Sequence, residues 1–194
     1  MAVILDMIGS VLISGYVILL ILRINFNMSS ASDSATTNLG IQESLVDAMS
    51  SVESDFRLAG FNVPDPKNSI AIADSQRIRI RVDLDNNNTV DSVEWYVGAP
   101  LAKYTDRQVR ILYRRVNNGT PLGIAYGVTT FKLKYFDQDG IQTSVLSMIS
   151  VIEVSIAVSS TYKIADQIDP TQQGYASAFW RQTRLSSRNI KRHG

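Results

Sequence analysis

One short segment of this 194-residue chain has the residue types and the spacing of a metal-binding loop. Its oxygen-bearing residues fall at the ligand positions of a twelve-residue calcium loop: Asp83, Asp85, Asn87, Thr89, Asp91 and Glu94. Asn88 stands where such loops favour glycine, and asparagine tolerates the left-handed conformation better than most residues. We therefore predict a calcium site, with an Asn-rich hairpin turn that needs no metal as the alternative.

The remaining composition gives little support to other site chemistry. Cysteine is absent, which removes disulfides, thiolate catalysis and Cys-based metal sites. The single histidine, His193, lies in a basic tail, so a Ser–His triad or a multi-His metal site is not expected. No pair of carboxylates is marked by its local sequence as general acid and base. Because these catalytic groups are not indicated, we do not predict an enzyme. Because the net charge is only +1, we do not predict nucleic acid as the main ligand.

The elements that must hold the acidic loop are expected to be strands. Residues 76–82 alternate isoleucine or valine with arginine, which is typical of a strand with one buried face. We interpret its arginine stripe as a solvated face, with anion binding as the alternative. Residues 89–97 should pair back on this strand as a hairpin. Further strands are predicted at 69–73, 108–116, 128–136, 149–158 and 179–185.

A helix should cover one face of this sheet. Between residues 39 and 60, apolar side chains recur mostly at three- and four-residue steps, which is the helical period. Gly60 and Pro64 should end this amphipathic helix. Residues 24–38 are rich in Ser, Thr, Asn and Asp, which compete with helical backbone bonds, so we expect a loosened connector there. Antiparallel hairpins packed on one helix indicate an α+β fold.

The chain begins with 22 apolar residues that contain one charge, Asp6, and are closed by Arg23. About 20 such residues in a helix span the roughly 30 Å core of a membrane. A cleaved signal peptide is the alternative, but no Lys or Arg precedes the apolar run. We therefore predict a retained single-pass anchor. The chain divides into a membrane-spanning helix (1–28), a connector with the amphipathic helix (29–60) and a β-rich head (61–194).

Asp6 is unusual because an unpaired carboxylate in hydrocarbon costs several kcal/mol. In one interpretation it lies near the helix end, at the depth of the lipid headgroups. In the other, Met1 is removed, as is common before alanine, and Asp6 becomes the fifth residue. It could then pair with the N-terminal ammonium of a neighbouring copy. Small residues nearby allow close packing of helices: Gly9, Ser10, Ser14 and Gly15.

This organisation resembles the type IV pilin and pseudopilin family. Its members have an apolar N-terminal helix with an acidic residue at mature position five, followed by an amphipathic helix and a β-rich head. The order of segments in the head is similar to that of PilW-type minor pilins and of J-type pseudopilins of type II secretion. These segments are an Arg-alternating strand, an Asp/Asn-rich turn, a strand with Tyr113-Arg-Arg, and residues 128–140 and 151–158. Residues 181–189 are similar to their terminal strand.

The resemblance implies a structural subunit of a cell-envelope filament. Such a subunit would assemble with other copies, or with other pilin-like subunits, through its N-terminal helix, and would depend on an inner-membrane assembly machinery. It would be a single-pass inner-membrane protein with its head in the periplasm or in an extracellular filament. The alternative function is a membrane-anchored binding or accessory domain of another envelope complex.

Overall fold

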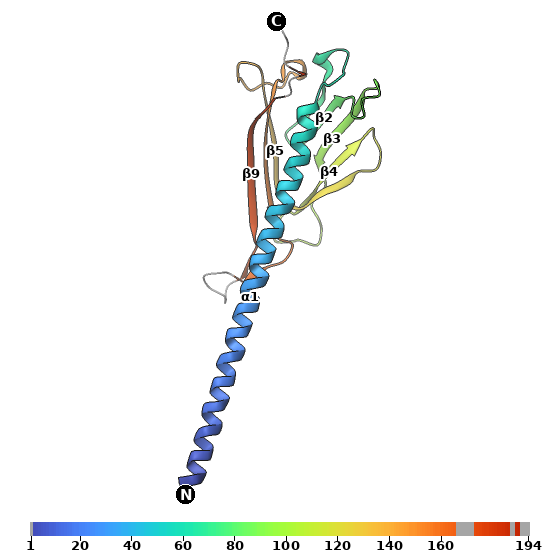
Figure 1. The fold of residues 1–194 in the computed structure, drawn as a ribbon. Coiled ribbons are helices and arrows are strands. Elements are labelled where there is room, and N and C mark those ends of the chain that lie inside the picture. Colours follow the sequence, from blue (N-terminus) through green and yellow to red (C-terminus); the bar gives the residue numbers. More distant parts are fainter. Residues whose placement is uncertain (1, 166–172, 187–188, 191–194) are drawn as a thin grey trace.

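The computed structural model describes residues 2–165, 173–186 and 189–190, and shows one very long helix attached to one large sheet (Figure 1). The helix α1 (Ala2–Leu58) has 57 residues, which corresponds to a length of about 85 Å. Its second half packs on the sheet, whereas its first half projects away from the head (Figure 1). The predicted α+β fold, with a long N-terminal helix on an antiparallel sheet, is confirmed.

The head is built on a seven-stranded antiparallel sheet with the strand order β1-β2-β3-β4-β5-β6-β9. Its strands are β1 (Ile70–Asp74), β2 (Arg77–Val82), β3 (Asp91–Val97), β4 (Arg110–Val116), β5 (Leu122–Phe136), β6 (Val151–Ser159) and β9 (Ser177–Leu185). The smaller elements are the 3-10 helices η1 (Pro66–Asn68) and η2 (Leu146–Met148) and the paired strands β7 (Ile164–Ala165) and β8 (Gln173–Gly174). Each of the seven predicted strands has a counterpart in the large sheet, and β5 begins six residues before its predicted start.

The main core lies between α1 and one face of the sheet. The alternation in β2 buries its apolar residues completely, including Ile78 and Ile80. On the helix, the buried apolar stripe consists of Leu45, Ala48, Met49, Val52, Phe56 and Ala59. Leu39, which shares the helical spacing, is exposed although Ser34, earlier on the helix, is buried, so Leu39 lies on a side of α1 that faces away from the head. The buried apolar stripe of α1 therefore begins at Leu45 and does not include Leu39.

The polar segment 24–38 is helical throughout, which corrects the prediction of a loosened connector. Part of this segment is already held by the head, because Ser34 is buried and the Thr37 Oγ1 lies 2.7 Å from the Tyr162 hydroxyl. The helix ends at Leu58, close to the predicted stop. Gly60 then adopts a left-handed conformation (φ +79°), and its N–H donates to the Arg81 carbonyl at 2.9 Å. The first half of α1 is therefore joined to the head without a helical break.

Removal of residues 1–28 should leave a soluble and folded head. Of the described side chains of α1 that precede Ser34, none is buried, so the deletion removes no part of the core. Circular dichroism and gel filtration of residues 29–194 would test this expectation, with the full chain in detergent as the reference. An aggregated or unfolded fragment would show that the head depends on the projecting helix.

Candidate functional site

The predicted metal loop connects β2 to β3 beside the C-terminal end of α1, where the Asp83 N–H donates to the Phe61 carbonyl at 2.9 Å. Three of the predicted ligands come together in it. Asp83, Asp85 and Asp91 each offer a carboxylate oxygen, and these oxygens lie within 4.8 Å of one another. Asn88 adopts a left-handed conformation (φ 63°), as expected for its place in the loop. The hairpin thus gathers an acidic cluster from residues up to eight positions apart.

Hydrogen bonds already hold this loop in shape. The Asp83 carboxylate is buried and accepts the Asn62 side-chain amide at 2.7 Å and the backbone N–H groups of Asn87 and Asn88 at 3.0 and 2.9 Å. The Asn62 contact, which outweighs the opposing effect of burial, and the backbone donors hold the pKa of Asp83 below its usual range. The Asp91 carboxylate accepts the Leu84 N–H at 3.0 Å. The turn therefore forms without a cation.

Two other predicted ligands have different surroundings. Thr89 closes an Asx turn, because its N–H donates to the Asn87 side-chain oxygen at 2.7 Å. Glu94 lies in β3, where the strand register places it opposite Arg79 on one side and Arg115 on the other. The sheet thus directs its carboxylate to arginines, and the structure removes Glu94 from the proposed ligand set. The loop spacing could not reveal this, because the register depends on residues outside the loop.

Calcium binding by the remaining oxygens stays a prediction. If the ion binds, the melting temperature of the full chain should rise with calcium. The free energy of unfolding should increase by about 2.7 kcal/mol at a hundredfold excess of calcium over the dissociation constant. Magnesium should stabilise less, because it requires tighter octahedral geometry. Asp85→Ala removes one candidate ligand and should abolish this increment. The loop should stay folded, because the described hydrogen bonds of Asp83 and Asp91 would remain. Asp139→Ala serves as the control. Equal melting temperatures in chelator and in millimolar calcium would contradict the prediction.

Glu94 is the centre of a charged cluster on the sheet. Its carboxylate is buried and accepts Arg77 Nε at 2.5 Å and Arg115 Nε at 2.8 Å, and Arg79 Nη2 lies 3.3 Å away. Burial raises the pKa of Glu94, but the hydrogen bonds from Arg77 and Arg115 and the nearby positive charges outweigh it, so the pKa lies below its usual value. The interpretation of the β2 arginines as a solvated stripe is thus corrected for Arg77 and Arg79, while Arg81 is exposed.

A second buried acid, Asp55, was not singled out by the sequence. It lies on α1 and accepts the Trp95 indole N–H at 2.8 Å and both Nε and Nη2 of Arg114, at 2.7 and 3.0 Å. The Asp55 contact holds the pKa of Arg114 above its usual value. These bonds join the helix to β3 and β4. The available signal was an acidic residue between Val52 and Phe56 in the apolar stripe, but its partners are 40 and 59 residues away.

The predicted assembly residues all lie on the projecting half of α1. Asp6 is exposed, and the Ser10 hydroxyl donates to the Met7 carbonyl at 2.9 Å. A Cβ added at Gly9 or Gly15 would meet nothing within 4 Å. The other predicted small position is Ser14, which is also exposed. These positions therefore form an accessible surface that nothing else in the described chain covers.

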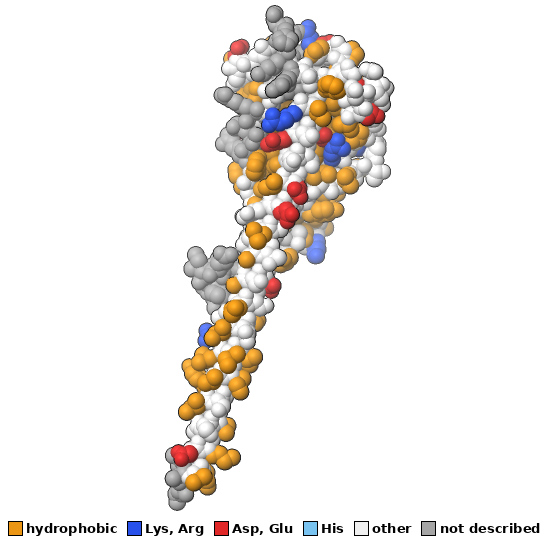
Figure 2. Space-filling view, in the orientation of Figure 1, with side chains coloured by type: hydrophobic (Ala, Val, Ile, Leu, Met, Phe, Trp, Pro, Cys, Tyr) orange, Lys and Arg blue, Asp and Glu red, His pale blue; other side chains and the backbone are white. Residues whose placement is uncertain are grey.

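Apolar side chains surround this half of the helix, as Figure 2 shows on one face. The described large apolar residues between Val3 and Met28 are exposed, and the helix is long and apolar enough to cross a membrane. Exposure of so much apolar surface to water is unfavourable, so it requires a membrane or partner helices. The membrane-spanning character of the N-terminal helix is thus supported by its length, its composition and its lack of contacts with the head.

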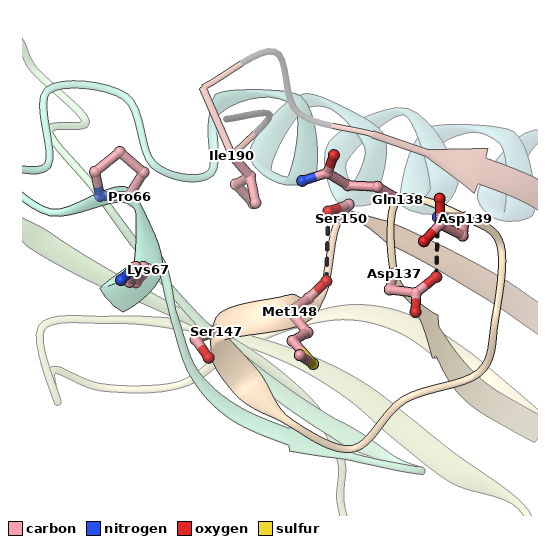
Figure 3. A pocket seen from close by; sticks show the side chains of 9 residues that line it. All are labelled: Pro66, Lys67, Asp137, Gln138, Asp139, Ser147, Met148, Ser150 and Ile190. Carbon is pink, nitrogen blue, oxygen red and sulfur yellow. Dashed lines mark hydrogen bonds between the residues drawn. The ribbon is translucent and has the colours of Figure 1, made fainter. Parts of the chain in front are cut away.

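A shallow cavity of about 300 Å³ lies between η1, η2 and the turn after β5 (Figure 3). Pro66, Met148 and Ile190 contribute to its lining, together with the turn after β5. In that turn the Asp137 carboxylate accepts the Asp139 and Ile141 N–H groups at 3.0 and 2.9 Å, so Asp137 holds the turn in shape. No nucleophile and base lie within hydrogen-bonding distance of each other among the described lining residues.

No family model matches this sequence, and no curated protein sequence matches it.

Proposed function

We propose that this protein is a structural, pilin-like subunit of a cell-envelope filament that assembles through its N-terminal helix. The observation that carries the proposal is the division of one unbroken helix into a free apolar half and a half that forms the core of the head. In this proposal the chain is a single-pass inner-membrane protein with its head in the periplasm or in an extracellular filament. Its partners are other copies or other pilin-like subunits, and an inner-membrane assembly machinery.

The length of the projecting segment supports this proposal. A membrane span needs about 20 residues, but burial on α1 begins only at Ser34, so about 50 Å of helix extends beyond the head. Because residues 24–33 are also helical, the head is held at a fixed distance from the apolar segment. The same apolar surface can lie in lipid before assembly and among the helices of neighbouring copies afterwards. A long helix with both properties is what a filament core requires.

The test of this function is the Asp6→Ala variant. A carboxylate among apolar helices must be paired, and the N-terminal ammonium of a neighbouring copy can supply the positive charge. We expect Asp6→Ala to leave insertion and folding intact and to reduce filaments below detection, since an apolar substitution favours insertion. Electron microscopy of material from cells that produce the full chain measures this effect. Asp33→Ala, which removes an exposed acid beyond the apolar segment, should retain filaments.

Filaments at normal amounts from Asp6→Ala would contradict the pairing of Asp6. The alternative function is a membrane-anchored binding or accessory domain of another envelope complex. The open positions at Gly9 and Gly15 favour it equally, because they allow close approach by a helix of any partner. Discrete particles in place of filaments, in the wild type as well, would support this alternative.

A further inference from the structure

Two charged surfaces of opposite sign lie on opposite sides of the head. The first, which we call the acidic helix face, is formed by the exposed side chains of Glu43 and Asp47 on α1. No cation lies within salt-bridge distance of either among the residues that the structure describes. Further along the helix, Glu53 pairs with Arg57 at 3.6 Å and adds no net charge. Figure 2 shows acidic side chains on the helix where it meets the head.

The second surface, the arginine face, covers β2, β3 and β4 on the side of the sheet away from α1. Ile78 and Ile80 are buried beneath the helix, so the alternate residues of β2 point to the opposite side. The arginines of this face are Arg77, Arg79, Arg81 and Arg115. Arg77, Arg79 and Arg115 surround the single buried carboxylate of Glu94, whereas the Arg81 Nη1 donates to the Asn68 carbonyl at 3.1 Å. Asp74 lies opposite Arg77 in the register. Four positive charges against two negative charges leave a net charge of +2.

The arginines of this face remain accessible to a partner. The side chains of Arg77, Arg79 and Arg115 are 43%, 26% and 25% exposed although they also bind Glu94. Because guanidinium groups carry several donors in a fixed plane, each can bind one carboxylate inside the head and a second one outside it. The surface is therefore suited to carboxylates that approach from another molecule.

The positions of the two faces along the long axis differ. The Gly60 N–H bonds to the Arg81 carbonyl, so these residues lie at the same level. From that level, Asp47 lies about 20 Å back along the helix, and the Arg77–Arg79 stretch about 10 Å back along β2. A copy that places its acidic helix face against the arginine face of another must therefore be displaced by about 10 Å along the axis.

We propose that the acidic helix face of one copy docks on the arginine face of the next copy, in one repeated contact. The inference rests on the proposed function and specifies how the heads associate. The partner is a second copy of this chain, because one molecule presents both complementary surfaces. Since the surfaces lie on opposite sides and at different levels, the contact is heterologous and staggered, and such contacts produce open helical arrays. The charges fix the register of the heads, while the apolar helices hold the copies together.

Cysteine cross-linking in membranes of cells that produce the full chain tests this contact, because the chain has no cysteine of its own. Asp47→Cys and Arg81→Cys replace exposed residues, one on each face. In the proposed contact, position 81 lies about 10 Å along the axis from position 47 of the docked copy. A bismaleimide long enough to span this distance should give dimers when the two single variants are produced together, and none when either is produced alone. Dimers from either variant alone would show a contact between identical surfaces and would overturn the proposal, as would the absence of dimers from the mixture.

Charge reversal provides a second measurement on the same protein. Asp47→Arg or Arg81→Glu alone should reduce filament yield severalfold, and the double variant should restore it, because each copy then presents both reversed faces. Lys103→Glu makes the same change in charge as Arg81→Glu at an exposed residue outside both faces, and should have no effect. Filaments that are insensitive to both Asp47→Arg and Arg81→Glu would overturn this contact and leave the filament function standing. Failure of the wild type to form filaments would instead contradict the proposed function.

Discussion

Replacement of Glu94 by glutamine should lower the free energy of unfolding of the head by about 2 to 4 kcal/mol. The wild-type carboxylate is 2% exposed and compensates three guanidinium groups that converge on it. Glutamine keeps the volume but removes the negative charge, so the arginines would repel one another without compensation. The expected loss is below the upper limit for fully buried pairs, because the arginine side chains are 25 to 43% exposed and partly screened by water.

Denaturant unfolding of the full chain in detergent measures this loss. The matched control is Glu53→Gln, which removes the same charge from a partly exposed i,i+4 pair with Arg57 and should cost no more than about 0.5 kcal/mol. A result for Glu94→Gln that equals the control would mean that the arginines do not depend on the buried carboxylate.

The free energy of unfolding should depend on pH through the ionisation of the Glu94 carboxylate. The pKa of Glu94 is lower in the folded protein than in the unfolded chain, where glutamate titrates near pH 4.3. Its stabilising effect is therefore complete above that pH and is lost as the pH falls through the folded-state pKa. The wild type should lose more stability on acidification than Glu94→Gln. The variant should keep some acid sensitivity, since the pKa of Asp83 is lowered as well.

The elements of the head could be predicted from the sequence because their patterns are local. The alternation in β2 and the turn after it specify a hairpin, and the observed register from Arg77–Tyr96 to Val82–Asp91 agrees with it. Antiparallel pairing of successive segments then gives most of the sheet. The connection from β6 to β9 contains β7 and β8, which are only two residues each and have no recognisable period.

The helix in segment 24–38 illustrates the limits of local propensity. Serine, threonine and asparagine each weaken a helix by well under 1 kcal/mol, whereas a break would create two new helix ends with unpaired backbone groups. With strong helix on both sides, continuation is the more stable choice, and the contact of Thr37 with Tyr162 supports it. The roles of Asp55 and Glu94 were missed for a different reason. Each depends on arginines that are distant in the sequence and adjacent only in the folded sheet.

The Asp55→Ala variant should destabilise the head by about 3 to 5 kcal/mol, because it breaks a buried pair and leaves the Trp95 indole N–H without an acceptor in the core. Asp47→Ala, on the exposed side of the same helix, is the control and should change stability by no more than about 0.5 kcal/mol. The contribution of Arg114 can be isolated with Arg114→Ala and the double variant. A coupling energy of about 0.5 to 3 kcal/mol is expected for residues in one hydrogen-bond network.

Because Asp55 lies far from the apolar segment, its substitution should change the stability of the head without changing the insertion of the anchor into the membrane. The residue lies about 50 Å along the helix from the end of the apolar segment at Leu22, so its substitution leaves the membrane-spanning surface unchanged. Asp55→Ala should therefore fractionate with membranes like the wild type, while its head is cleaved faster by protease. The buried pair joins α1 to β3 and β4, and its loss should loosen the helix from the sheet first. Equal protease resistance of the variant and the wild type would show that apolar packing alone holds the helix on the head.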